Sequence, residues 1–355
     1  MTTDLYKPEP ESLQETLASE SAYRWVAYHI YYGGMPNVLL SECLIPLVES
    51  LIERGLVRDY FYINYWLEGS HVRLRLRVPR SVDSASVDAA VIVPVQEYLK
   101  RRPSMHPMVE LTEYGFYEQL FVGEFTEADR PRFFDADGNP VFMANNSIHR
   151  RPYEREIFRY GGEQCMLLAE RHFVASTSMA VKVMQRGNQD VRTLLLGIAT
   201  QLSFVTACAF LRDRELVRDF FVAYHQRWIS GYAEGTEYTT EGGQSMHASS
   251  VANLRLKMLP LLPAIADNEL AGMPQLLRDW AETNLRVRSD LEQLYAEGVL
   301  QFDYQDERRS PESIEAAAWS LCHSLIHMTN NRMMVSVADE AFIAFQISQA
   351  METTT

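Results

Sequence analysis

Arginine side chains gather in two short segments of this sequence, at spacings that could bind an anion. In the first segment, HVRLRLRV (71–78), valine and leucine alternate with four polar residues: His71, Arg73, Arg75 and Arg77. Successive side chains of a β-strand point to opposite faces, so this octet predicts a strand with one apolar face and one cationic face. Cations on one strand face repel each other, and the chain has a net charge of -14. The clustering therefore suggests a bound anion.

The second basic segment is HRRPYEREIFRYGG (149–162), whose Pro152 and terminal glycines predict a short helix that ends at the glycine pair. In such a helix Arg155 and Arg159 would lie one turn apart, and Glu156 would lie beside Arg159. Two interpretations stay open at this point. The segment is either an exposed, salt-bridged helix that contributes little to stability, or an arginine pair that Glu156 holds toward a carboxylate.

The segment SLCHSLIHMTNNR (320–332) places His323 and His327 four residues apart, on one face of a predicted helix. Zinc proteases use this spacing, but here no glutamate adjoins the first histidine and no third ligand is evident, so we predict no metal site. His327 is then either a structural histidine or an acid–base group, because imidazole titrates near neutral pH. Three polar residues follow it: Asn330, Asn331 and Arg332.

Apolar patterns predict the elements that must position these residues. Residues 25–32 and 59–69 are expected to form strands, the second of them in a hairpin with 71–78, and residues 36–55 and 83–101 have helical spacing. The C-terminal half is expected to be an array of helices over residues 163–185, 188–211, 215–228, 273–298 and 310–334. The expected fold class is α+β, an N-terminal sheet layer with covering helices followed by a mainly helical C-terminal half.

These patterns divide the chain into a flexible N-terminal lead-in (1–22), an α+β part (23–162) with both arginine segments, and a helical part (163–355) with His327. Residues 234–245 are expected to form a flexible loop. A hairpin is expected at FFDADGNPVFM (133–143). Its aspartates resemble a calcium loop, but glycine falls at the fourth position instead of the sixth, which favours a simple turn.

The composition of the 355 residues, 47% hydrophobic and 23% charged, is typical of a soluble globular protein with a substantial core. No stretch approaches the ~20 apolar residues of a membrane span, and the N-terminus does not resemble a signal peptide. The net charge argues against direct binding of nucleic acid, and no nucleotide-binding or serine-hydrolase motif is present. The four cysteines form no CxxC pair, which favours reduced thiols and a cytoplasmic location. They are Cys43, Cys165, Cys208 and Cys322.

Four motifs together resemble a known family. In chain order they are WVAYHIYYG, YFYINYWLEGSHVRLRLR, YEREIFRYGG and SLIHMTNNR, and they run from about Trp25 to Arg332. They resemble the C-terminal elimination domain of lantibiotic dehydratases, a domain that also occurs alone in thiopeptide biosynthesis. The RLRLR strand by itself is a weak signal, whereas the YEREIFRYGG and SLIHMTNNR elements are specific.

The resemblance implies a lyase that acts on a ribosomally made precursor peptide, consisting of a leader and a core. In that family a separate domain or subunit esterifies serine or threonine with glutamate from glutamyl-tRNA, and the elimination domain expels the glutamate to leave dehydroalanine or dehydrobutyrine. The glutamylation domain is missing here, so a separate glutamylation subunit is the expected partner, and a homodimer is compatible with the sequence. No cofactor and no metal are implied, because the ester already activates the leaving group.

The resemblance also implies roles for single residues. Arg75 and Arg159 are expected to bind the glutamyl carboxylate or the enolate, Glu156 to orient an arginine, and His327 to transfer a proton. Further substrate-binding candidates are Arg73, Arg77, Arg155, His71 and Arg332. The two arginine segments are expected to form walls of one anion pocket.

Two other functions stay open. Thiopeptide pyridine synthases share this fold and join two dehydroalanines in a formal cycloaddition, with loss of water and of the leader peptide. They would be expected to lack the arginine, glutamate and histidine set that is present here, which favours elimination. The third function is a noncatalytic scaffold that binds the leader peptide.

Overall fold

The computed structural model divides the chain into two compact units, Ala18–Glu154 and Arg155–Thr355, the second of which also includes Pro10–Leu17. The predicted loop at 234–245 lies outside the described residues. The structure describes residues 12–106, 114–186, 192–231, 251–304 and 307–352.

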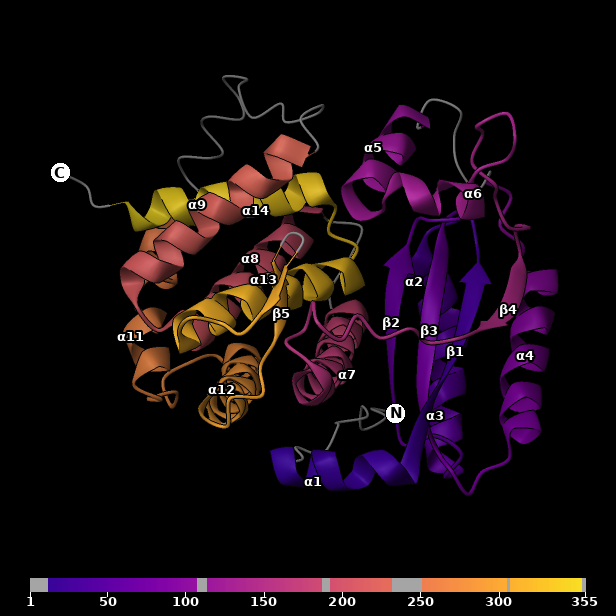
Figure 1. Cartoon of the computed structure of the whole chain (residues 1–355), viewed down its shortest axis with the longest axis horizontal. Coiled ribbons are helices and arrows are strands. Elements are labelled where there is room, and N and C mark those ends of the chain that lie inside the picture. Colours follow the sequence, from indigo (N-terminus) through magenta and orange to yellow (C-terminus); the bar gives the residue numbers. More distant parts are fainter. Residues whose placement is uncertain (1–11, 107–113, 187–191, 232–250, 305–306, 353–355) are drawn as a thin grey trace. The chain divides into compact units, whose positions relative to one another are not determined.

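The first unit is built on a four-stranded antiparallel sheet in the order β2-β3-β1-β4 (Figure 1). The predicted hairpin is confirmed, because β2 and β3 pair antiparallel, and they are joined by a turn in which Glu68 and Gly69 have φ values of 62° and 102°. The strands are β1 (Tyr23–Tyr31), β2 (Asp59–Tyr65), β3 (His71–Pro79) and β4 (Ser147–Arg151).

The apolar face of β3 is fully buried, as its alternating sequence predicts. Its side chains are at most 1% exposed; they are Val72, Leu74, Leu76 and Val78. Tyr28 of β1, opposite Leu74, donates a hydrogen bond of 2.6 Å to Asp88, which shows that α4 packs on this side of the sheet. The two segments of this unit that were predicted to be helical, 36–55 and 83–101, are confirmed as helices. They are α2 (Pro36–Leu39), the π-helical turn η2 (Leu40–Leu44), α3 (Ile45–Glu53) and α4 (Ser84–Arg101).

A smaller aromatic cluster holds the connection between α4 and β4. Leu67, Tyr117, Phe121 and Phe134 are buried together there. The turn predicted at 133–143 is present as a bridge between Phe134 and Pro140, and no group in the described part of the chain could hold a metal ion. This region contains α5 (Tyr114–Glu124), η4 (Glu127–Asp129) and α6 (Arg130–Phe133).

The YEREIFRYGG segment forms a turn and not the predicted helix. Residues 152–156 have no regular structure, a hydrogen-bonded turn covers 157–160, and α7 begins only at Glu163. Gly161 and Gly162 adopt φ values of 90° and 103°, in the left-handed region that glycine tolerates and a continuous helix cannot contain. Arg155 and Arg159 therefore do not share a helical face.

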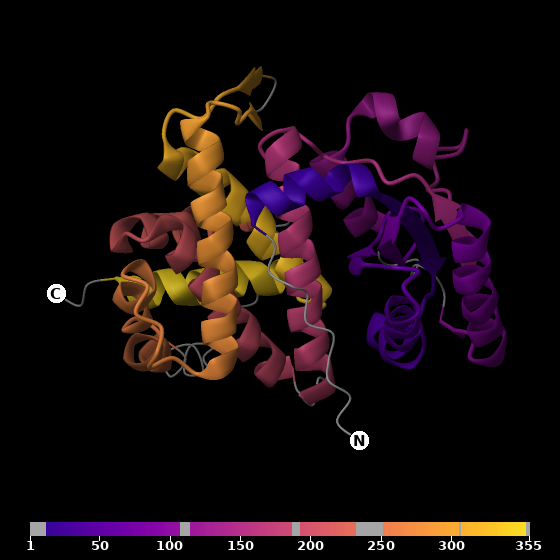
Figure 2. The ribbon, with the colours of Figure 1, turned by 90° about the horizontal axis from the view of Figure 1, so that it is seen from below.

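The second unit is mainly helical, as predicted, and α9 and α14 run along each other in it (Figures 1 and 2). Ser313 caps the helix that carries both histidines, since its side chain accepts a hydrogen bond of 3.1 Å from the backbone of Ala316. The helices are α7 (Glu163–Arg186), α8 (Arg192–Leu211), α9 (Arg214–Gly231), α11 (Leu261–Ala266), α12 (Gln275–Ala296), α13 (Ile314–Arg332) and α14 (Val337–Met351). Two short strands, β5 (Phe302–Tyr304) and β6 (Glu307–Arg309), pair antiparallel.

Two further details of the sequence prediction are wrong. The lead-in is ordered from Leu13 onward, in α1 (Leu13–Ser19) and η1 (Glu20–Ala22), because Leu13 buries its apolar side chain. The prediction that no stretch approaches a membrane span is also wrong. By length and composition alone, α8 could cross a membrane, since an 18-residue window of it has a mean hydropathy of 2.0. Of that window 67% is buried inside the protein, as expected for a core helix.

Candidate functional site

The cationic face of β3 continues onto both neighbouring strands of the first unit. Arg75 lies opposite Phe61 of β2 and Ala27 of β1, and Ala27 in turn lies opposite Arg151 of β4. Directly opposed residues of an antiparallel pair point to the same face. Arg151, a residue the sequence analysis did not assign to the site, therefore joins the arginines of β3 on one face of the sheet, which we call the basic sheet face.

His71 and Arg73 form a connected pair at one end of the basic sheet face. The Arg73 Nε donates to the His71 Nε2 at 3.1 Å, which requires the His71 proton on Nδ1, where it is donated to the Gly69 carbonyl at 2.7 Å. Burial lowers the pKa of His71 to about 3, and the nearby Arg73 adds to this effect. His71 is therefore neutral and can serve as an acceptor for arginine. The Arg73 guanidinium also lies 3.4 Å from the centroid of the Tyr65 ring.

Arg75 and Arg77 are both buried, but their surroundings differ. The Arg75 guanidinium lies over aromatic rings, 4.7 Å from the centroid of Tyr153 and 5.5 Å from that of Phe61. Arg77 instead forms an ion pair of 3.2 Å with Asp59 and donates to Ser19 at 2.6 Å. These contacts link Arg77 of β3 to β2 and to Ser19, and the substrate contact expected of Arg77 stays a prediction.

His29 on β1 is a further member of the basic sheet face that the sequence analysis did not identify. Its ring stacks on His71 with centroids 5.0 Å apart, and its Nδ1 has no hydrogen-bond partner among the described residues. Burial, followed by the charge of Arg73, lowers the pKa of His29 to about 2. Both stacked histidines are thus neutral, and the positive charge of this face comes from its arginines.

In the second unit, the turn before α7 carries the predicted Glu156–Arg159 pair. The Arg159 Nη1 lies 3.0 Å from the Glu156 Oε1, and both side chains are largely exposed, at 44% and 59%. Arg155 behaves differently, since it makes two hydrogen bonds of 2.7 and 2.8 Å with the buried carboxylate of Glu170. Arg159 is therefore accessible to a substrate, whereas Arg155 ties the turn to α7.

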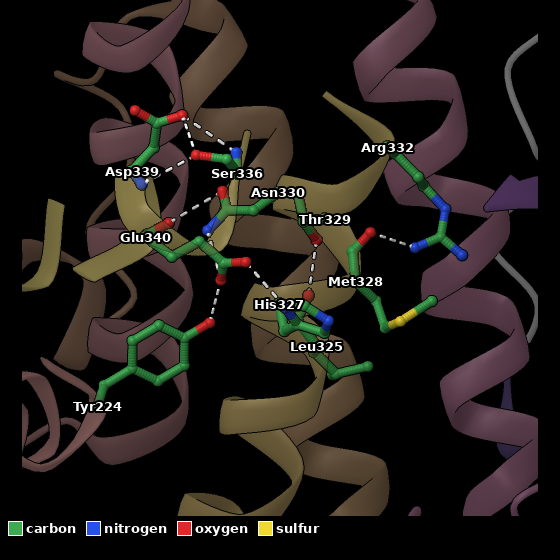
Figure 3. Close-up of polar contacts among 11 residues, drawn as sticks. Tyr224, Leu325, His327, Met328, Thr329, Asn330, Arg332, Ser336, Asp339 and Glu340 are labelled. Atoms are coloured by element: carbon green, nitrogen blue, oxygen red, sulfur yellow. Dashed lines mark hydrogen bonds and ion pairs between the residues drawn. The ribbon is translucent and has the colours of Figure 1, made fainter. Parts of the chain in front are cut away.

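His327 forms a carboxylate–histidine pair with Glu340, in the first turn of the helix that follows (Figure 3). Its Nδ1 lies 2.8 Å from the Glu340 Oε1, and its side chain is 21% exposed whereas that of Glu340 is 1% exposed. The ring packs against Trp228, with centroids 5.0 Å apart. Since Glu340 occupies Nδ1, the nitrogen left for proton transfer is Nε2.

His323, one turn earlier on α13, has no such partner. Its Nε2 is buried without a hydrogen bond among the described residues, and burial lowers its pKa to about 3. The positive charges of Arg227 and Arg159 add to this shift. Arg159 thus lies within electrostatic range of His323, which is one helical turn from His327 on α13.

Arg332 is fully buried at the end of α13. It donates to the Met328 carbonyl at 2.6 Å and to the Thr177 hydroxyl at 3.1 Å, and its guanidinium lies over the Phe173 ring. These contacts link α13 to α7, and the substrate contact expected of Arg332 stays a prediction. The prediction that the arginine segments form one anion pocket stays a prediction.

A family model described as "Lantibiotic biosynthesis dehydratase C-term" matches residues 25–351. The chain belongs to this family. No match was found among curated proteins. The resemblance stated from four motifs is thereby confirmed over nearly the whole chain.

Solved structures with a similar fold include two proteins of about the same length. The "Pyridine synthase, TbtD, from thiomuracin biosynthesis" is 18% identical, with a TM-score of 0.64 over 92% of this chain and 97% of that one. TsrL is 17% identical, with a TM-score of 0.57 over 92% and 94% of the two chains. The tRNA-dependent lantibiotic dehydratase MibB from Microbispora sp. 107891 is 15% identical, with a TM-score of 0.41 over 92% of this chain and 28% of that one. The first two likenesses confirm the fold.

Proposed function

We propose that this member of the dehydratase family is a lyase that eliminates glutamate from glutamylated serine or threonine in a ribosomally made precursor peptide. The observation that carries this proposal is the combination of Arg159 with the His327–Glu340 pair in the second unit. β-Elimination needs a group that moves a proton and a cation for the negative charge that develops, and this region supplies both.

In the reaction that we propose, each of these residues has a role. The Nε2 of His327 takes the α-proton of the esterified residue, and the electron pair passes through the enolate to form the Cα=Cβ bond. The bond from Cβ to the ester oxygen breaks, and glutamate departs as a carboxylate. Arg159, oriented by Glu156, stabilises the anion, for which a guanidinium fork is well suited.

The basic sheet face supplies cations of the same kind in the first unit. Arg73 and Arg75 lie on aromatic rings with their charge retained, because arginine stays protonated even when it is buried. We assign them to binding an anionic group of the substrate, and Arg75 is the main candidate because its guanidinium lies over two aromatic rings. Variants of Arg73 and Arg75 test this assignment separately from variants of Arg159 and His327.

The second candidate function is that of a pyridine synthase, which joins two dehydroalanines of a peptide. The observation that favours it is the fold likeness to a pyridine synthase over nearly the full length of both chains. The comparisons at the level of the whole chain favour this candidate, while the residues of the site favour elimination. A cycloaddition releases no anion comparable to glutamate. Arg159 and Arg75 would therefore have no such anion to stabilise.

One experiment separates the candidates. The protein is incubated with a precursor peptide that carries glutamyl esters, and the products are analysed by mass spectrometry. Elimination predicts the loss of one glutamic acid for each modified site. If the ester persists, and a peptide that already contains dehydroalanine is converted to a macrocycle with release of its leader, pyridine formation replaces elimination as the function.

A further inference from the structure

Glu340 is a buried carboxylate in the first turn of α14, and it faces hydrogen-bond donors from two other helices (Figure 3). On α13, His327 lies 2.8 Å from its Oε1 and the Asn330 amide donates to its Oε2 at 3.2 Å. On α9, the Tyr224 hydroxyl donates to Oε2. Burying a carboxylate costs several kcal/mol unless donors replace water, so this set of donors explains how the charge is kept inside the protein.

The two histidines of α13 provide an internal comparison. They are one helical turn apart and both pack on aromatic rings, yet only His327 has a carboxylate partner in the described part of the chain. A carboxylate on Nδ1 holds the ring in one orientation, keeps the proton of the neutral ring on Nδ1 and favours the imidazolium. The same carboxylate is absent at His323, which is buried and neutral.

We propose that Glu340 is a positioning residue for His327, and that Tyr224 and Asn330 hold its carboxylate in place. This inference rests on the proposed function, because it assumes that His327 transfers a proton. Glu340 touches no substrate in this arrangement, since it is 1% exposed and lies behind the ring. Its effect is to present Nε2 in the unprotonated form and to stabilise the ring once it has accepted a proton.

Two variants separate the charge of Glu340 from its role as an acceptor. Glu340→Gln keeps an oxygen for Nδ1 and loses the charge, so we expect kcat to fall about 10-fold. Glu340→Met has a similar size and no acceptor, so we expect kcat to fall about 100-fold. In both variants KM should change little, because Glu340 does not contribute to substrate binding.

The pH profile gives a readout that a purely structural role would not move. The titratable groups around the ring are Glu340 on α14, Tyr224 on α9 and His323 on its own helix, with Arg159 and Arg227 acting on His323. Loss of the Glu340 charge disfavours the imidazolium. The half-maximal point of the activity profile should therefore move to lower pH in Glu340→Gln, whether His327 accepts or donates the proton.

The ring of His327 can also be observed directly, by its nitrogen chemical shifts in NMR with His327→Ala for assignment. In the wild type the neutral ring should carry its proton on Nδ1, and in Glu340→Met it should be a mixture of both forms. Asp339→Asn is the matched control, because Asp339 lies in the same helical turn but bonds to Ser336 and Arg192 and not to His327. It should leave the ring and kcat unchanged.

A wild-type ring and a wild-type kcat in Glu340→Met would overturn the inference. So would equal losses in Glu340→Gln and Asp339→Asn, which would indicate a general effect on the start of α14. If Glu340→Met does not fold, the pH profile of Glu340→Gln decides the matter. If the wild-type protein releases no glutamate but its ring proton moves in Glu340→Met, the proposed reaction fails and the positioning by Glu340 stands.

Discussion

At the scale of single residues, the arginines of this protein divide by what their guanidinium groups contact. Arg77 and Arg155 face the carboxylates of Asp59 and Glu170, both of which are buried. Arg73 and Arg75 face aromatic rings, and the Arg159 pair with Glu156 is exposed. The same residue type thus contacts buried carboxylates at some positions, and aromatic rings or an exposed carboxylate at others.

Arg159→Ala should lower kcat/KM for glutamylated peptide about 100-fold, because it removes a cation that stabilises the departing anion. Its effect on the free energy of unfolding should be under about 1 kcal/mol, since exposed ion pairs contribute little. Arg218→Ala is the control, because it removes an exposed partner of Asp219 elsewhere in the same unit and should leave activity unchanged. Equal activities in both variants would remove Arg159 from the mechanism.

Arg75→Met should mainly affect activity, whereas Arg77→Met should mainly affect stability. Arg77→Met removes the ion pair of 3.2 Å with the buried Asp59, which also lies 4.0 Å from Arg58, so the free energy of unfolding in urea should fall by about 3 kcal/mol. Arg75→Met removes contacts with two aromatic rings and should cost about 1 kcal/mol, while glutamylated peptide accumulates unreacted. Normal turnover by Arg75→Met would show that the basic sheet face serves only the fold.

His323→Phe should make the protein less sensitive to acid. The pKa of His323 is lowered to about 3 by burial, against 6.5 for an exposed histidine, so as the pH falls below 6.5 the unfolded chain takes up a proton that the folded protein does not. Stability is therefore fully present above pH 6.5 and is lost toward lower pH, by about 1.4 kcal/mol per pH unit for this residue. The free energy of unfolding, measured with urea between about pH 6 and 4, should change less steeply with pH in the variant, by that amount. The same pH dependence in the wild type and in His323→Phe would contradict a lowered pKa of His323.

At the scale of secondary-structure elements, local pattern predicted most of the strands and helices. The octet 71–78 and the histidine helix have clear periodicity and tertiary packing agrees with it, so both formed as expected. The Glu156–Arg159 contact was also predicted, although a turn and not a helix brings the two residues together. The turn was missed because two successive glycines with positive φ are compatible with either a helix end or a bend.

Long-range pairs could not be predicted from one sequence. Glu340 reaches His327 only because α14 folds back along α9 and presents its first turn to α13. The sequence shows the capping box of Ser336 and Asp339 at that helix start, but it does not show which buried side chain faces it. Arg151 and His29 were missed for the same reason, because strand order decides their neighbours.

The glycine turn before α7 gives a prediction for an element. Gly161→Ala should lower the free energy of unfolding by about 2 kcal/mol or more, because φ is 90° and the added methyl would lie 2.8 Å from the Phe302 ring and 3.1 Å from the Cys165 sulfur. Gly197→Ala is the matched control within α8, where the new methyl meets nothing within 4 Å. It should stabilise the protein by about 0.5 to 1 kcal/mol. Thermal unfolding of both variants should show a decrease in stability for Gly161→Ala and an increase for Gly197→Ala.

At the scale of the whole molecule, the chain is acidic although arginines cluster on the basic sheet face of the first unit. A net charge of -14 is unfavourable for binding tRNA, so we propose that glutamylation belongs to a separate partner and that this chain receives the esterified peptide. A small anion needs only a local cationic site, and we propose that the basic sheet face and Arg159 serve in this way.

The measurement that tests the central proposal most directly is the stoichiometry of a single turnover. Excess protein is mixed with glutamylated precursor peptide, and free glutamate and dehydrated residues are quantified over time for the wild type and for His327→Ala. The proposal predicts that the wild type forms one glutamate for each dehydrated residue, and that His327→Ala forms neither while remaining folded. Peptide that keeps its glutamyl esters with the wild-type protein, or equal turnover by His327→Ala, would contradict it.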